Sequence, residues 1–180
     1  GRTVDLTEDH SLVTLGDAGE LQPLYPRDCV IGRDRLPIAN LPEVPGGQPV
    51  PIAMAVLAGL YLAEGCLPEQ RGVVNIAVQP PLRREQVRDL VASLGIQAQR
   101  TDCDVIFTHH ATRRWLLRLF GKRSGHKFVA AEVLTWSREA RQALVAGYFA
   151  GDGCLWADTN GTVQLTAVST SRQLRDGMVD

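Results

Sequence analysis

Long hydrophobic runs are the first feature that this sequence lacks. Its longest apolar stretches, around residues 52–63 and 143–150, are far shorter than the roughly 20 residues of a membrane-spanning helix. No charged start followed by an apolar segment resembles a signal peptide. The sequence gives no sign of a membrane or of export, and we expect a cytoplasmic protein.

Cysteine is also scarce. The four cysteines form no CxxC pair, and no histidine stands at zinc-finger spacing. A disulfide framework and a structural zinc site are therefore both disfavoured. We expect reduced thiols at Cys29, Cys66, Cys103 and Cys154.

Excess positive charge is missing too, because 19 Lys and Arg stand against 20 Asp and Glu. For a polyanionic partner, the distribution of charge matters more than its sum. Residues 83–127 hold ten basic and four acidic residues, whereas residues 1–80 hold five basic and ten acidic ones. The middle segment is therefore basic, and its simplest interpretation is a solvated face.

The first 45 residues are predicted to form a β-rich domain. Short runs that alternate apolar and polar residues occur at 3–7, 11–14 and 29–31, and Gly, Pro and Asp break them. A Pro- and Gly-rich segment follows, and we place a linker at residues 46–50. Residues 51–180 are expected to form a second domain.

The second domain is predicted to be α+β. Helices are expected at residues 52–63, 82–94, 112–120 and 138–150, and a further helix begins at 172–178. Strands are expected at residues 73–78, 96–100, 105–108 and 162–168.

An internal repeat is the most informative feature. Residues 57–67 (LAGLYLAEGCL) are echoed at 145–155 (VAGYFAGDGCL), an offset of 88, and both copies end an apolar helix with an acid followed by Gly-Cys-Leu. Small residues in both copies, among them Gly59 and Gly147, permit close helix packing. Packed side by side, the two helices bring Glu64 and Asp152 together.

Two carboxylates at helix C-termini are electrostatically unfavourable, because the helix dipole leaves partial negative charge there. They also repel each other unless a cation lies between them. A hard divalent ion such as Mg²⁺ meets that need and activates water for phosphodiester hydrolysis. The alternative is that Glu64 and Asp152 only terminate their helices and face solvent.

Both copies of the repeat resemble the LAGLIDADG motif of homing endonucleases. The resemblance covers about residues 51–180 and implies αββαββα repeats, the first at 51–127 and the second, incomplete, at 128–180. It implies a monomer that hydrolyses double-stranded DNA with Mg²⁺ or another divalent cation. Glu64 and Asp152 become the metal-binding catalytic acids, although Glu64 departs from the usual Asp.

The resemblance also implies DNA contacts, because this family reads the major groove with antiparallel sheets. Lys127 is the preferred residue for stabilising phosphate charge. Ordinary surface solvation is the alternative for each basic residue, and adjacent His109 and His110 point oppositely on a strand, which disfavours a metal site. The candidate DNA contacts are Arg83, Arg84, Arg100, Arg113, Lys122 and Arg123.

The segment Thr7-Glu8-Asp9-His10 resembles the TxxH block of inteins. The resemblance implies a Hint-type splicing domain in which Thr7 and His10 assist cleavage of a peptide bond, with the exteins of a host protein as partners. The sequence begins at Gly1 and lacks a terminal His-Asn, so we expect that this chain does not splice and that its endonuclease module is truncated.

Three functions are compatible with the sequence. The leading hypothesis is an intein-resident, metal-dependent homing endonuclease. The second is a DNA-binding LAGLIDADG scaffold without cleavage activity, and the third is an α+β interaction domain whose motif helices are only a packing interface. Salt-dependent DNA affinity separates the first two from the third, and metal-dependent nicking separates the first from the second.

Overall fold

The computed structural model describes residues 6–36, 47–69, 72–79, 81–157, 159 and 161–178. The chain divides into two compact units, residues 1–43 and 44–180. Most of the expected strand at 3–7, and residue 46 of the expected linker, lie outside the described residues.

The first unit contains a β-hairpin. Strands β1 (Leu12–Leu15) and β2 (Leu21–Leu24) pair antiparallel, and a 3-10 turn, η1 (Pro26–Asp28), follows them. None of residues 6–36 is buried. The hairpin is therefore held mainly by its backbone hydrogen bonds rather than by a hydrophobic core.

The strand expected at residues 29–31 is wrong. The Asp34 carboxylate accepts the Val30 amide at 2.6 Å, and the Asp34 amide donates to the Val30 carbonyl at 3.1 Å. This side chain offers the backbone a local turn in place of a sheet partner.

The second unit contains both copies of the repeated motif, and the helices and strands predicted for it are confirmed. Two short strands, β3 and β7, were not predicted. The first repeat runs α1 (Ile52–Glu64), β3 (Gly65–Cys66), β4 (Val73–Ala77), α2 (Pro81–Ser93), β5 (Ala98–Arg100), β6 (Asp104–Thr108) and α3 (His110–Phe120). After the 3-10 turns η2 (Ser124–His126) and η3 (Ala131–Thr135) come α4 (Arg138–Asp152), β7 (Gly153–Ala157), β8 (Val163–Ala167) and α5 (Arg172–Gly177).

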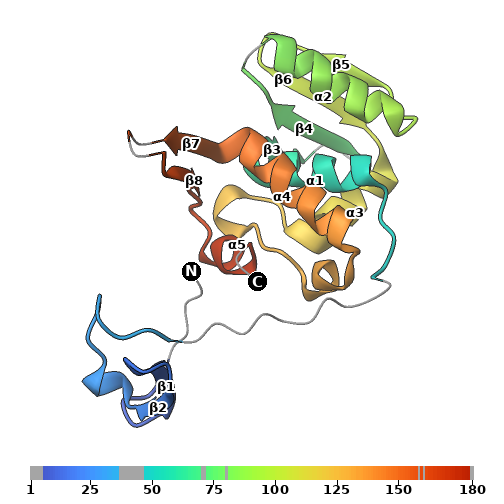
Figure 1. Cartoon of the computed structure of the whole chain (residues 1–180). Coiled ribbons are helices and arrows are strands. Elements are labelled where there is room, and N and C mark those ends of the chain that lie inside the picture. Colours follow the sequence, from blue (N-terminus) through green and yellow to red (C-terminus); the bar gives the residue numbers. More distant parts are fainter. Residues whose placement is uncertain are drawn as a thin grey trace. The chain divides into compact units, whose positions relative to one another are not determined.

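The first repeat forms a four-stranded antiparallel sheet in the order β3-β4-β6-β5. Side chains alternate between its two faces, and α2 lies along one of them (Figure 1). The buried residues Val74, Ile76, Val105 and Phe107 point to the helices. The opposite face is open.

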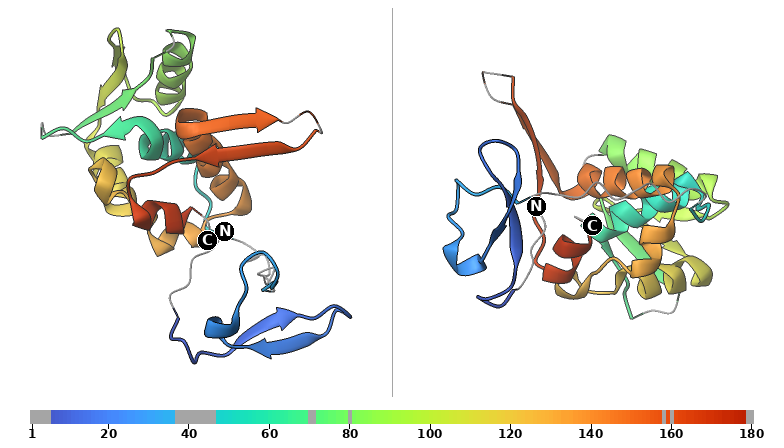
Figure 2. Two further views of the ribbon diagram at one scale, coloured as in Figure 1. Left: turned by 90° about the vertical axis from the view of Figure 1, so that its left-hand side faces the viewer. Right: turned by 60° about the horizontal axis from the view of Figure 1, so that its bottom comes forward.

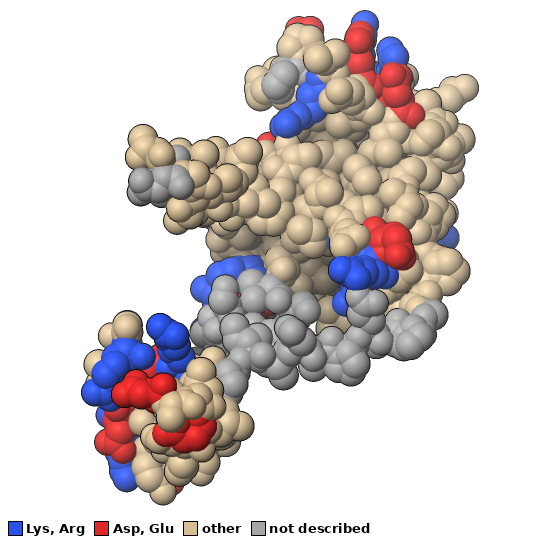
Figure 3. Space-filling view, viewed as in Figure 1, with Lys and Arg blue, Asp and Glu red and all other residues tan. Residues whose placement is uncertain are grey.

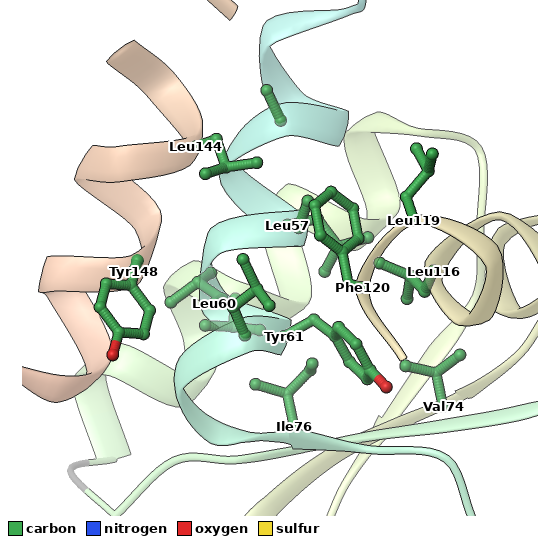
Figure 4. Packing of buried hydrophobic residues seen from close by; sticks show 14 of the residues in the cluster. Leu57, Leu60, Tyr61, Val74, Ile76, Leu116, Leu119, Phe120, Leu144 and Tyr148 are labelled. Carbon is green, nitrogen blue, oxygen red and sulfur yellow. The ribbon is translucent and has the colours of Figure 1, made fainter. Parts of the chain in front are cut away.

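The core joins this sheet to the helices, as Figure 4 shows. Tyr61 and Leu57 of α1, Phe120 of α3 and Val74 of β4 are all fully or almost fully buried. Nearby, the Trp115 and Trp136 rings stack with centroids 5.7 Å apart. The hydrophobic core therefore lies between α1, α3 and the covered face of the sheet.

Helices α1 and α4 pack side by side, as the repeat predicted (Figures 1 and 2). A Cβ atom on Gly59 would overlap the backbone of Leu144 and Tyr148, and one on Gly147 would overlap the Val56 carbonyl. The two backbones approach this closely because neither glycine has a side chain.

Strands β7 and β8 form an antiparallel hairpin that extends beyond α4 (Figure 2). Its side chains Leu155, Val163 and Leu165 are exposed. The local fold of the second motif therefore matches that of the first, but its sheet is not covered by helices within the described residues.

The described part of the expected linker belongs to the second unit. The Gln48 amide donates to the Thr135 carbonyl at 2.7 Å, and the Gln48 carbonyl accepts the Ser137 amide at 3.1 Å. Among the described residues, no helix is both long and apolar enough to cross a membrane.

Candidate active site

Glu64 and Asp152 end the two motif helices. A Cβ atom on Gly151 would overlap the Ala63 side chain and lie 3.1 Å from Cγ of Glu64, so the last turns are in direct contact. Each helix continues into Gly, whose amide donates to a carbonyl four residues earlier, Gly65 to Tyr61 and Gly153 to Phe149. The packing therefore brings the two acids to one end of the helix pair.

Burial raises the pKa of both carboxyl groups. The charge of Asp152 raises the pKa of Glu64 further, whereas Lys127 and Arg83 act to lower it. Lys127 also acts to lower the pKa of Asp152. Each helix end therefore disfavours the charged form of its acid, and Lys127 is a nearby positive charge that acts on both acids.

Lys127 is buried rather than directed to solvent. Its Nζ donates to the carbonyls of Tyr61 at 2.8 Å and Leu62 at 3.0 Å, and lies 5.1 Å from the Tyr61 ring centroid. Burial lowers the pKa of Lys127 to about 8. The amine thus binds two carbonyls in the last turn of α1, and the Tyr61 carbonyl also accepts the Gly65 amide.

Two further contacts hold this arrangement and were not predicted from the sequence. The Tyr61 hydroxyl donates to the Gly121 carbonyl at 2.5 Å, and the Ser171 hydroxyl donates to the Lys127 carbonyl at 2.5 Å. Both partners lie more than 40 residues away, so no local pattern could have identified them.

A small cavity opens beside Asp152. It has a volume of about 170 Å³, and both Asp152 and Lys127 line it. Polar groups of residues 169 and 170 face the same space. The remaining lining residues are Leu62, Ala63, Ser124, Val168, Ser169, Thr170 and Leu174.

The carboxylate oxygens of the acid pair are ligands that suit a hard divalent cation. Carboxylate oxygens are the preferred protein ligands of Mg²⁺, which keeps several water ligands. Glu64 and Asp152 are half-buried or exposed and therefore accessible, and a cation between them would relieve the repulsion that raises the pKa of Glu64. No group of three or more His, Cys, Asp or Glu residues forms a metal cluster in the described part of the chain.

Four of the six candidate DNA contacts have protein partners: Arg84, Arg100, Arg113 and Lys122. Arg100 pairs with Val105 across the sheet, on the covered face, and its guanidinium contacts Glu85 of α2 at 2.8 Å. Arg84 donates to the carbonyls of Val78 at 3.0 Å and Gln79 at 2.6 Å. Arg100 therefore does not belong to the open face where the resemblance placed it.

The other candidates occupy different places, and on the face drawn in Figure 3 the Lys and Arg side chains of the second unit lie in separate groups. Arg83 is exposed at the start of α2, and its charge acts on Glu64. Arg113 and Lys122 contact the loop between β3 and β4, through the Pro68 carbonyl at 2.9 Å and the Glu69 carboxylate at 2.5 Å. Arg123 is exposed.

The open face of the sheet is mixed in polarity and not basic. Asn75, Gln99 and Thr108 lie on it beside the apolar Val73 and Ile106, and the strands β3 to β6 place no Lys or Arg there. Within the described residues, Oδ1 of Asn75 is buried and has no hydrogen-bond partner. The alternation in Val74-Asn75-Ile76 predicts that Asn75 lies on the face opposite Val74 and Ile76, although Asn75 is not among the DNA contacts expected from the sequence.

His109, where the sequence disfavoured a metal site, and His10 of the expected splicing block both take part in local structures. The Thr112 amide donates to Nδ1 of His109 at 3.3 Å, so His109 caps α3. In the first unit, the His10 amide donates to the Thr7 carbonyl at 3.1 Å, and both residues are exposed in a turn.

Comparison with known families bears on this site. Residues 51–131 match the family model of the LAGLIDADG-like domain. The LAGLIDADG-like domain thus spans the whole first repeat, including Glu64 and Lys127, and supports a homing endonuclease-type domain. No curated protein matches the chain. A LAGLIDADG-like domain indicates a homing endonuclease or a DNA-binding family, and it implies DNA binding.

Proposed function

We propose that this chain is part of an intein-resident homing endonuclease that hydrolyses DNA phosphodiester bonds with Mg²⁺ or another divalent cation. The observation that carries the proposal is the convergence of Glu64 and Asp152 at the ends of two tightly packed motif helices. Only one of the two acids lies within the matched domain, and the fold supplies the second from α4.

Glu64 and Asp152 would hold the cation through their carboxylate oxygens. A bound divalent cation supplies Lewis-acid activation of water and of the scissile phosphate. The close contact between α1 and α4, called the seam below, leaves no room for side chains at Gly59 and Gly147 and fixes the two acids. Lys127 fixes the last turn of α1 through two carbonyls, so its role is to position Glu64 and to offset the charge of the acids.

The open face of the first sheet would bind DNA. Amide groups of Asn75 and Gln99 and the hydroxyl of Thr108 are able to donate to and accept from base edges.

The splicing context rests on the first unit. Its Thr7-Glu8-Asp9-His10 turn and its β-hairpin support a Hint-type domain, in which Thr7 and His10 would act on a splice junction and the exteins of a host would be partners. We further propose a monomer that acts in the cytoplasm.

The test is cleavage of a supercoiled plasmid library that carries candidate insertion sites, with and without Mg²⁺. Wild type is compared with Glu64→Gln, Asp152→Asn and, as a control, Asp89→Asn on the exposed surface of α2. Mg²⁺-dependent cutting that Glu64→Gln and Asp152→Asn abolish supports the paired-carboxylate mechanism. A folded chain that binds DNA without cutting it refutes that mechanism and favours a DNA-binding scaffold.

A further inference from the structure

A hollow on α3, away from the acid pair, is lined by two arginine side chains. It has a volume of about 610 Å³ and is lined by His110, Arg113, Arg114 and Leu117, together with Gly72 at the start of β4. Residues spaced by three, four and seven positions lie on one side of a helix, so α3 presents one basic stripe to the hollow.

Gly72 keeps the hollow open. Its φ of +85° is one that residues with side chains rarely adopt, and a Cβ atom there would lie 2.8 Å from Cε1 of His110. The backbone of Gly72 also binds the helix start, because its carbonyl accepts the His109 amide at 2.9 Å. The position therefore favours glycine both for its conformation and for the room it leaves beside the imidazole.

Arg113 has hydrogen-bonding capacity left over. One of its terminal nitrogens donates to the Pro68 carbonyl at 2.9 Å, which holds the loop after β3. Its Nε is buried and has no hydrogen-bond partner among the described residues. An unsatisfied buried donor on a cation is unfavourable unless an anion or water accepts from it.

The pKa of a nearby acidic side chain already reflects this positive charge. The Glu69 carboxylate contacts Lys122 at 2.5 Å although its side chain is mostly exposed. The hydrogen bond from Lys122, and then the charges of Lys122, Arg123 and Arg113, lower the pKa of Glu69. One carboxylate therefore lies in the field of three cations, one of which lines the hollow.

We propose that the hollow on α3 binds a phosphate group of the DNA backbone through Arg113 and Arg114, and that Glu69 competes with this phosphate for the neighbouring cations. The inference rests on the proposed function, because DNA is the partner. Guanidinium groups suit this ligand, since their planar donors match phosphate oxygens. The site supplies affinity rather than sequence readout.

The experiment measures binding of a fluorescent DNA duplex over a range of salt concentrations, in chelator so that cleavage plays no part. Arg114→Gln is expected to weaken binding and to reduce the slope of log affinity against log salt concentration by about 0.9, the contribution of one phosphate contact. Glu69→Gln is expected to tighten binding roughly threefold at low salt.

Two matched controls lie nearby. Arg118 and Glu132 form an exposed ion pair between α3 and η3, outside the hollow. Arg118→Gln and Glu132→Gln should therefore bind DNA with wild-type affinity and slope. Circular dichroism of each variant verifies the fold.

A second measurement separates DNA from free phosphate. Inorganic phosphate is added while the imidazole signals of His110 are followed by NMR, with exposed His126 as the reference. Selective shifts at His110, combined with the altered DNA slope, support the proposal. Shifts without any effect of Arg114→Gln on DNA binding would overturn it and leave a free-phosphate site.

Wild-type affinity and slope in both Arg114→Gln and Glu69→Gln would also overturn the proposal. That result leaves the endonuclease proposal intact, because cleavage through Glu64 and Asp152 is measured separately with Mg²⁺. Conversely, a chain that never cuts DNA but shows the altered slope retains the phosphate site.

Discussion

The two copies of the repeated motif share one sequence pattern but differ in burial. Leu67, which closes the first copy, is 2% exposed, whereas Leu155, at the same place in the second copy, is 70% exposed. Both follow an acid, a glycine and a cysteine, and both follow a helix that ends at the acid. The motif therefore sets the local path of the chain, and tertiary packing decides which side chains it buries.

The cause of the difference lies beyond the motif. In the first repeat, α1 and α3 cover β4 and bury Val74 and Ile76, and α2 covers β5 and β6. In the second, β7 and β8 form a two-stranded hairpin, and Leu165 remains 53% exposed. The shared seam of α1 and α4 is nevertheless tight, so the acid pair depends on the seam rather than on two equally covered sheets.

The largest effect that tests this comparison is expected from Leu67→Ala. Removing a buried leucine side chain should lower the free energy of unfolding by about 2–5 kcal/mol. Leu155→Ala should change it by less than about 0.5 kcal/mol, because the side chain is already in solvent. Urea denaturation of both variants measures the difference, and equal losses would show that the hairpin face is covered in solution.

Much of this comparison could be predicted from the sequence. Helical and strand periodicity located α1, α2, α3 and α4 and the strands that they flank, because these signals are local. The offset of 88 between the motif copies predicted the side-by-side helices and the proximity of Glu64 to Asp152. The glycines at the seam gave that prediction a physical reason, because they permit the two helices to approach closely.

Other features depend on distant residues and could not be predicted. The burial of Lys127 follows from carbonyls at Tyr61 and Leu62, more than 60 residues earlier. The orientation of Arg100 follows from the register of β5 with β6, since a shift of one residue would reverse its face. Strand β3 contains only two residues, which is too short for a recognisable alternation.

A second prediction concerns the seam that both repeats share. Gly59→Ala should lower the free energy of unfolding by about 1–3 kcal/mol, because its Cβ meets the backbone of α4 and the helices must separate. Gly125→Ala is the control, since a Cβ there meets nothing within 4 Å. The same denaturation measurement applies, and Gly59→Ala should also reduce Mg²⁺-dependent cleavage. A fully stable Gly59→Ala variant would contradict the close packing of α1 against α4.

The smallest effect concerns Lys127, which binds the last carbonyls of α1. Its pKa is about 8 in the folded chain, against an ordinary value of 10.5. Between these pH values the unfolded chain binds more protons than the folded one. The contribution of Lys127 to the free energy of unfolding therefore increases as pH rises from 8 to 10.5, and this increase is lost as pH falls. Burial raises the pKa of Tyr61, which opposes the trend above its ordinary value of 10.0.

Lys127 therefore acts without opposition from Tyr61 between pH 8 and pH 10. In that window the contribution of Lys127 should amount to about 1–2 kcal/mol. Thermal unfolding at several pH values should show this rise in wild type and in the control variant Lys122→Met. In wild type, the Lys122 amine contacts the exposed Glu69 rather than the carbonyls of α1. Lys127→Met should lose the rise, because methionine does not titrate. If Lys127→Met kept the same pH dependence as wild type, the amine would not be buried at the end of α1, and the charge that offsets the acid pair would have to come from another residue.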